Sequence, residues 1–505
     1  MGEQQYRARP RHAAPTPAQV LWPAAAVVLV LLLLALLVRP GSFVVSIGPT
    51  GPPVAPAAQG PAARAAVGPP SGEPAPSPDP AVGAADDADG ALDALGGLLL
   101  ARDAAVVGGD PAGWTAAGGD PAAGTAPDGA LAVLRSLPVT AFESSVVPGT
   151  LAPTDDGADG TPDSATDGSA DAAGARWQAR VETRYELAGA VAVVRSDTVL
   201  LAPAPAGSWQ VVSWVPHPAP GEVGTVAPWD LGEVHASVGE RSVVLSWTDP
   251  AVVDDGSVPS QALQDAQAWG ARAAGWADRG ATVVDSYLGT GWPRSTLVLS
   301  PATTEQYDAL VPGPVPARPD VFAAVTTDVA TPTGGGDLVV LNPTARPELV
   351  EETWQVTVTH ELVHVASGAR YGDSQEVWLA EGLADLVGWS TVVPSTASRE
   401  DVAGRLLDRV AAGAADAGSL PSAEDFTAAD PEVVGDAYEG AWLAALLLQD
   451  ELGVDGLLEV YAAASGPTED PAGRTDGALT AATGQGREAF QTRWSGYVGA
   501  LAAAR

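Results

Sequence analysis

Two histidines enclose a glutamate in the sequence HELVH, residues 360 to 364, and this spacing suits a metal site. Residues four apart on a helix lie on one face, so His360 and His364 can both aim a ring nitrogen at one ion. Glu361 would then lie beside that ion. Apolar residues recur through TWQVTVTHELVHVASG, and Gly368 can end a helix there. The alternative is an ordinary buried helix whose two histidines find hydrogen-bond partners. The chain holds only 5 His, so chance pairing at this spacing is rare.

A catalytic zinc site needs a third protein ligand, and the sequence narrows the choice to an acidic residue. The chain has no Cys, and the other histidines lie far upstream. Downstream, EVWLAEGLAD offers Glu376 and Glu381 in a second helical pattern. Asp385 follows Glu381 by four residues on the same face, so Glu381 can bind the metal while Asp385 accepts a hydrogen bond from a ligand histidine. Glu376 is the alternative ligand.

HELVH followed by WLAEGLAD resembles the gluzincin zinc metallopeptidases, in particular the peptidase MA-like group with HExxH and then WLxEGxA. The resemblance covers roughly residues 230 to 505. It implies that His360, His364 and Glu381 are zinc ligands. It also implies that Glu361 is the general base that takes a proton from water and passes it to the leaving amine. The cofactor expected is therefore Zn²⁺, and the substrate a peptide or protein.

The resemblance further implies a group near the developing oxyanion and an edge strand for the substrate. Tyr438 is the expected oxyanion residue, and Tyr371 is the alternative. The alternative, that this tyrosine only packs in the fold or lies on the surface, is equally open. The segment DLVVLNP, residues 337 to 343, is expected at the sheet edge, where an extended peptide would lie by strand addition.

An uncharged apolar segment near the N-terminus predicts a membrane span. Leu21 to Val38 reads LWPAAAVVLVLLLLALLV, which as a helix is about one hydrocarbon thickness long. A cleaved secretory signal is the alternative, but its apolar core is shorter and a small-residue cleavage site follows it. Three arginines precede the span and Arg39 closely follows it. The positive-inside rule then places the N-terminus in the cytoplasm and the catalytic domain outside the cell membrane.

Composition divides the remaining chain into a tether and two folded parts. We expect residues 1–20 to be a short cytoplasmic segment, 21–38 the transmembrane helix and 39–87 a Pro/Gly/Ala-rich linker. Residues 88–220 are expected to form a small α+β domain, because helical patterns precede the strictly alternating strand Trp177–Leu187 and two further strands. This order weakly resembles the SnoaL-like cone fold, as a spacer or binding module. Residues 229–505 are expected to form the peptidase domain.

The fold class expected for the whole chain is α+β. Strand patterns at SVVLSW, STLVLS, VFAAV and DLVVLN and a long helix from about residue 260 precede the motif helix, and the pattern beyond Glu376 is helical throughout. We therefore expect a gluzincin-like domain with a small mixed sheet and a helical C-terminal half. It would follow a small α+β domain and a single transmembrane helix.

The charge of the chain excludes nucleic acid as a class of partner. A formal charge of −37 offers no basic stripe, so nucleic acid is not expected as a partner.

The favoured hypothesis is a membrane-anchored, outward-facing zinc peptidase. The alternative is a non-catalytic cell-surface binding module that keeps the metallopeptidase fold. A third possibility, that the middle domain carries the main activity, ranks last.

Overall fold

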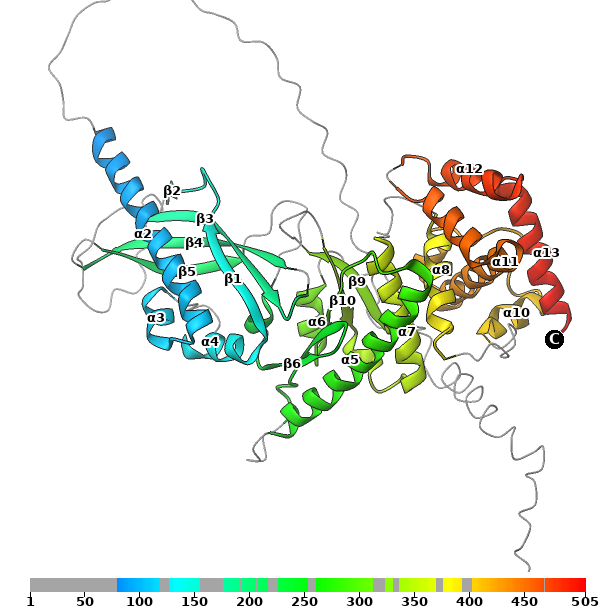
Figure 1. Cartoon of the computed structure of the whole chain (residues 1–505), viewed down its shortest axis with the longest axis horizontal. Helices are drawn as coiled ribbons and strands as arrows, with labels where there is room; N and C mark the ends of the chain where they lie inside the picture. Colours follow the sequence, from blue (N-terminus) through cyan, green and yellow to red (C-terminus); the bar gives the residue numbers. More distant parts are fainter. Residues whose placement is uncertain are drawn as a thin grey trace, which may run out of the picture.

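The computed structural model of the chain describes a folded body of two sheets and a helical layer (Figure 1). The described residues are 80–118, 127–154, 176–190, 192–205, 208–216, 226–252, 260–311, 323–329, 336–368, 376–392, 402–466 and 468–505. The predicted transmembrane helix and Tyr371 lie outside them. Within the described residues, no helix is both long and apolar enough to cross a membrane. Helix α2 (Pro80–Gly108) begins inside the segment predicted as linker.

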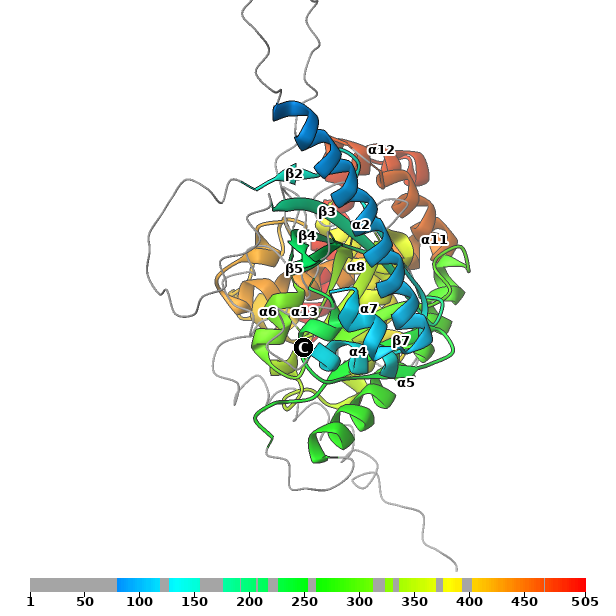
Figure 2. The same ribbon diagram turned by 90° about the vertical axis from the view of Figure 1, so that its left-hand side faces the viewer.

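The first sheet is antiparallel, with strand order β1-β3-β4-β5 and β2 paired to β3. Its strands are β1 (Val139–Val146), β2 (Ala152–Pro153), β3 (Trp177–Leu187), β4 (Val193–Ala204) and β5 (Ser208–Pro216). In β3, buried side chains alternate with more exposed ones along its whole length, as the sequence predicts. Figures 1 and 2 show α2 lying across this sheet, where Ala91, Leu95 and Leu99 pack against it. Two short helices, α3 (Pro111–Ala116) and α4 (Pro127–Ser136), follow α2.

The second sheet is mixed, with strand order β6-β7-β8-β10-β9. Its strands are β6 (Val234–Val238), β7 (Ser242–Trp247), β8 (Thr296–Ser300), β9 (Ala324–Val329) and β10 (Gly336–Leu341). The strands β7, β8 and β10 run parallel, and β6 and β9 are antiparallel to their neighbours. The predicted edge position of residues 337–343 is wrong, because β10 lies between β8 and β9. The edge strands are β6 and β9.

The two sheets share a continuous apolar core. Trp229, in the 3-10 turn η2 (Pro228–Asp230), meets Tyr185 and Phe142 of the first sheet at ring-centroid distances of 5.0 and 5.8 Å. The same cluster continues into Val243 and Leu245 of β7. Apolar burial of this kind is the main source of stability, so the sheets stabilise each other.

Helices pack on both faces of the second sheet. Helix α6 (Thr304–Leu310) packs in the apolar cluster shared with the first sheet. The other helices are α5 (Gln261–Leu288), α7 (Glu351–Ser367), α8 (Val377–Trp389), α10 (Gly404–Ala411), α11 (Pro431–Ala464), α12 (Pro471–Thr483) and α13 (Arg487–Ala503), with 3-10 turns η4 (Pro343–Ala345) and η5 (Asp425–Thr427). The largest apolar cluster fills the space between α5, α7, α8, α11 and the face of the sheet. The chain is thus a mixed α and β structure, as expected for its fold class.

A glycine sets how closely α8 and α11 approach. A Cβ added to Gly382 would lie 2.4 Å from the carbonyl oxygen of Ala441 and 3.2 Å from the Cβ of Ala445. No side chain can occupy that space without separating the two helices. The residue after Glu381 must therefore be glycine for α8 to pack at this depth.

We expect Gly382→Ala to lower the free energy of unfolding by ~1–3 kcal/mol, since both helices would have to shift. Gly499→Ala is the matched control, because a Cβ at this α13 position meets nothing within 4 Å. That change should raise stability by roughly 0.4–1 kcal/mol. Urea unfolding of the two variants measures both effects, and equal values for them would contradict the close approach.

Candidate metal centre

Helix α7 carries HELVH and is buried on nearly every side. Glu351 and Glu352 lie in its first turn, where carboxylates are favoured, and Gly368 ends it in the left-handed conformation with φ 62°. Every residue from Trp354 to Val365 is buried, because α5, α8 and the strands β9 and β10 surround this helix. A helix enclosed in this way holds its histidines in fixed directions.

Helix α8 brings the predicted acidic partners to the two histidines. Nε2 of His360 lies 3.0 Å from Nε2 of His364 and 3.1 Å from Oε2 of Glu381. The same Glu381 oxygen is 3.6 Å from Nε2 of His364. All three side chains are buried. Three donor atoms from two helices thus converge on one point.

Asp385 lies one turn after Glu381 and orients the first histidine. Its Oδ1 is 2.8 Å from Nδ1 of His360, so this nitrogen carries the proton that Asp385 accepts and Nε2 is directed to the cluster. Burial alone would lower the pKa of His360, but the charges of Asp385 and Glu381 outweigh it and raise that pKa. For Glu381, the two histidines outweigh burial and lower the pKa. The cluster therefore favours an ionised carboxylate at the ligand position.

Glu361 is fully buried beside this cluster, and one of its carboxylate oxygens is unsatisfied. Oε2 accepts a 2.7 Å hydrogen bond from the hydroxyl of Thr326 on β9. Oε1 has no hydrogen-bond partner among the described residues. Burial raises the pKa of Glu361, although the two histidines and Thr326 oppose the rise. A buried carboxylate oxygen without a partner is costly, so Glu361 is a candidate functional residue.

Two neighbours of Glu361 could not be found from the sequence. Thr326 lies 35 residues upstream on a strand. Tyr307 of α6 is also buried, and its pKa is raised first by burial and then by the charge of Glu361. A single threonine or tyrosine at such a distance carries no motif, and only the folded sheet brings either one to the motif helix.

The alternative ligand Glu376 is not part of the cluster. It is the N-cap residue of α8, and its Oε1 pairs with Nη2 of Arg487 at 2.6 Å. That ion pair ties the start of α8 to the start of α13. The structure therefore gives Glu376 a structural partner, and the ligand group contains Glu381 in its place.

Tyr438 lies near the cluster, on α11. Its ring centroid is 6.3 Å from that of His360 and 4.9 Å from that of Phe426, in an edge-on contact. The side chain is half-buried. The Tyr438 ring thus lies near His360, one of the three members of the donor group.

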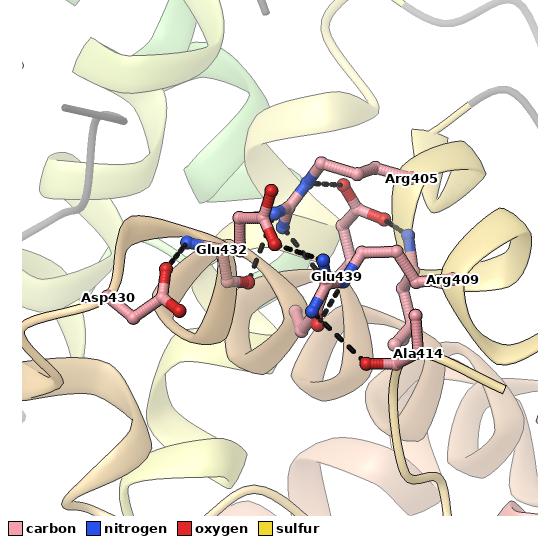
Figure 3. A network of polar contacts seen from close by, with 8 residues as sticks. Arg405, Arg409, Ala414, Asp430, Glu432 and Glu439 are labelled. Carbon is pink, nitrogen blue, oxygen red and sulfur yellow. Dashed lines mark hydrogen bonds and ion pairs between the residues drawn. The ribbon is translucent and has the colours of Figure 1, made fainter. Parts of the chain in front are cut away.

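A network of charged side chains fixes the first turns of α11, which carry this tyrosine (Figure 3). Arg409 of α10 pairs with Glu432 and, at 2.9 Å, with Asp436. Arg405 pairs with Glu439 at 3.3 Å, and Glu439 also accepts the backbone N–H of Leu406 at 2.6 Å. Several partly buried pairs acting together hold a helix more firmly than isolated surface pairs. The network therefore clamps α10 onto α11.

The donor set fits zinc. Ligands about 2.0–2.1 Å from a tetrahedral ion lie roughly 3.3–3.4 Å from one another. The separations of 3.0, 3.1 and 3.6 Å found here are close to that spacing. Two imidazoles and one carboxylate are also the donor types of catalytic zinc sites, which keep a further position open. His360, His364 and Glu381 could therefore hold one zinc ion.

Comparison with known proteins found no match to the chain, neither among protein-family models nor among curated proteins.

Proposed function

We propose that the protein is a zinc-dependent peptidase. The observation that carries the proposal is a fully buried carboxylate oxygen of Glu361 that has no partner among the described residues and lies beside the converging His360, His364 and Glu381. A structural cluster would gain nothing from leaving a buried carboxylate oxygen unsatisfied. A general base needs that oxygen free for the proton of an attacking water.

Each residue then has a separate task. A zinc ion at the three donors would supply a Lewis acid that polarises a carbonyl and acidifies water. Glu361 accepts the proton at Oε1 and delivers it to the leaving amine. Asp385 holds His360 in the tautomer that presents Nε2. Tyr438 would donate a hydrogen bond to the oxygen that gains charge.

The proposed substrate class, an extended peptide, is supported by strand β9, one of the two edge strands of the second sheet. An extended peptide can add to an unpaired strand through main-chain hydrogen bonds. Strand β9 carries Thr326, which contacts Glu361, so a peptide lying along this edge would reach the candidate base. The substrate side that was expected at residues 337–343 is thus assigned to residues 324–329.

We also propose that the peptidase is membrane-anchored. Support comes from the apolar segment Leu21–Val38 and from the arginines that precede it. The N-terminus would be cytoplasmic and the catalytic part outside the cell membrane. This orientation is tested by protease protection of the full chain in membrane vesicles.

The direct test is hydrolysis of a diverse peptide library by the full-length protein, followed by mass spectrometry. We expect cleavage products that disappear on chelation and return when zinc alone is added back. Cleavage that survives chelation would overturn the zinc mechanism. A zinc-loaded protein that binds peptides without cleaving any would support the binding module.

Tyr438→Phe tests the proposed oxyanion contact. Removing one such donor is expected to lower kcat by about 10²–10³, while zinc content and KM change little. The hydroxyl is the only group lost, so the packing against Phe426 is kept. Tyr497→Phe on the distant helix α13 is the matched control. Unchanged kcat in the Tyr438 variant would reduce Tyr438 to a packing residue.

A further inference from the structure

Thr326 lies on the edge strand β9 and also contacts the candidate base Glu361. Strand β9 pairs with β10 on one side, and no described strand pairs with its other side. The backbone N–H of Asn342 donates to the carbonyl of Ala323 at 2.8 Å, at the end of the β9–β10 ladder. Inward and outward backbone groups alternate along an antiparallel pair. The N–H and C=O of Thr326, three residues after Ala323, therefore point away from β10, to the side of β9 where no described strand pairs.

The side chain of Thr326 points across the sheet face toward α7. Ala324, two residues earlier on the same face, belongs to the apolar cluster around α7, whereas Val325 belongs to the cluster on the opposite face. The Thr326 hydroxyl lies 2.7 Å from Oε2 of Glu361 and 3.2 Å from the Glu361 backbone oxygen. One residue thus joins the strand that would receive a peptide to the carboxylate that would act on it.

We propose that Thr326 is a positioning residue that couples occupation of the β9 edge to the orientation of Glu361. The inference rests on the proposed peptidase function and adds a residue to it. A carboxylate with two unpaired oxygens can rotate between equivalent orientations. The hydroxyl of Thr326 engages Oε2 and so leaves Oε1 for the proton transfer.

Coupling follows because the backbone and hydroxyl of Thr326 move together. A peptide paired to the outward N–H and C=O would reduce the motion of this residue and so hold the hydroxyl against Glu361. Binding energy from a remote part of the substrate then appears in kcat. Peptides long enough to pair with β9 should therefore have a higher kcat than short peptides, and not only a lower KM.

The test compares Thr326→Val, which lacks the hydroxyl but keeps the shape, with Thr326→Ser, which keeps the hydroxyl. Thr296→Val is the matched control, since Thr296 is a buried threonine of the same sheet on β8, which β10 separates from the edge strand β9. We expect Thr326→Val to lower kcat by about 10²-fold and to abolish its dependence on peptide length, with KM and zinc content kept. Thr326→Ser and Thr296→Val should remain close to the wild type. Equal losses in both valine variants would overturn the inference and indicate a structural role.

Crystal structures of the zinc-loaded wild type and Thr326→Val provide a readout that needs no hydrolysis. We expect one orientation of the Glu361 carboxylate in the wild type and a rotated or divided one in the variant. An unchanged carboxylate would overturn the positioning role, whatever the activity. If the wild type cleaves no peptide but the carboxylate rotates in the variant, the peptidase function fails and the positioning contact stands.

Discussion

Glu361→Gln is expected to remove peptide hydrolysis and leave zinc bound. The amide cannot accept the proton of water, and the loss of a general base costs about 10²–10⁴ in rate. Zinc content should not change, because the donor atoms belong to other side chains. The measurement is kcat/KM on the peptides that the wild type cleaves, together with elemental analysis of the same samples.

The stability of this variant separates a functional residue from a structural one. Glu361 buries a carboxylate whose Oε1 has no hydrogen-bond partner among the described residues, so removal of its charge should not lower the free energy of unfolding. The amide can also keep the contact with Thr326, whose hydroxyl both donates and accepts. Glu352→Gln, at the exposed start of the same helix, is the control and should keep full activity. A strongly destabilised Glu361→Gln protein would mean that the carboxylate serves the fold.

His360→Ala is expected to remove zinc altogether, and with it all hydrolysis. His360 contacts both other members of the donor group and is the histidine that Asp385 orients. A metal that binds only the folded protein stabilises it by ~4 kcal/mol when free zinc is about 1,000 times Kd. The wild type should therefore unfold at higher denaturant concentration with zinc than with chelator, and the variant should not.

His235→Ala controls for the loss of an imidazole, since His235 lies on β6, remote from α7. It should bind as much zinc as the wild type. His360→Ala also loses stability because Asp385 and Glu381 lose their histidine partner. Unfolding in chelator measures this loss in each variant, so it can be subtracted from the effect of zinc. Wild-type protein whose stability does not respond to zinc would contradict the metal centre.

Local sequence patterns were sufficient to predict most strands and helices of this fold. The alternation in Trp177–Leu187 predicts β3 with the observed bounds, because one face is buried and the other is not. The apolar runs at SVVLSW and STLVLS are the buried strands β7 and β8. The helix that bears HELVH ends at the predicted Gly368. These elements are fixed by residues close together in the chain.

Strand order could not be predicted in the same way, and the wrong edge is the result. VFAAV and DLVVLN are both apolar, so neither pattern says which strand is outermost. Strand β9 also starts later than predicted, at Ala324, and continues through Thr326 and Thr327, which no apolar pattern indicates. Pairing between distant segments decides these features. For the same reason Glu361 was predicted but its partner Thr326 was not.

The donor atoms and the contact to Glu361 come from different layers of the fold. Metal content and activity, which assays often equate, can therefore differ. All three donors lie on the neighbouring helices α7 and α8. The hydroxyl that engages Glu361 comes from the outermost strand of the sheet. Proteins open locally in separate cooperative units, so opening of this edge need not disturb the packed helices. In the proposed zinc peptidase, damage at that edge would leave a fully metallated but inactive protein, so metal stoichiometry would overestimate the active fraction of a preparation.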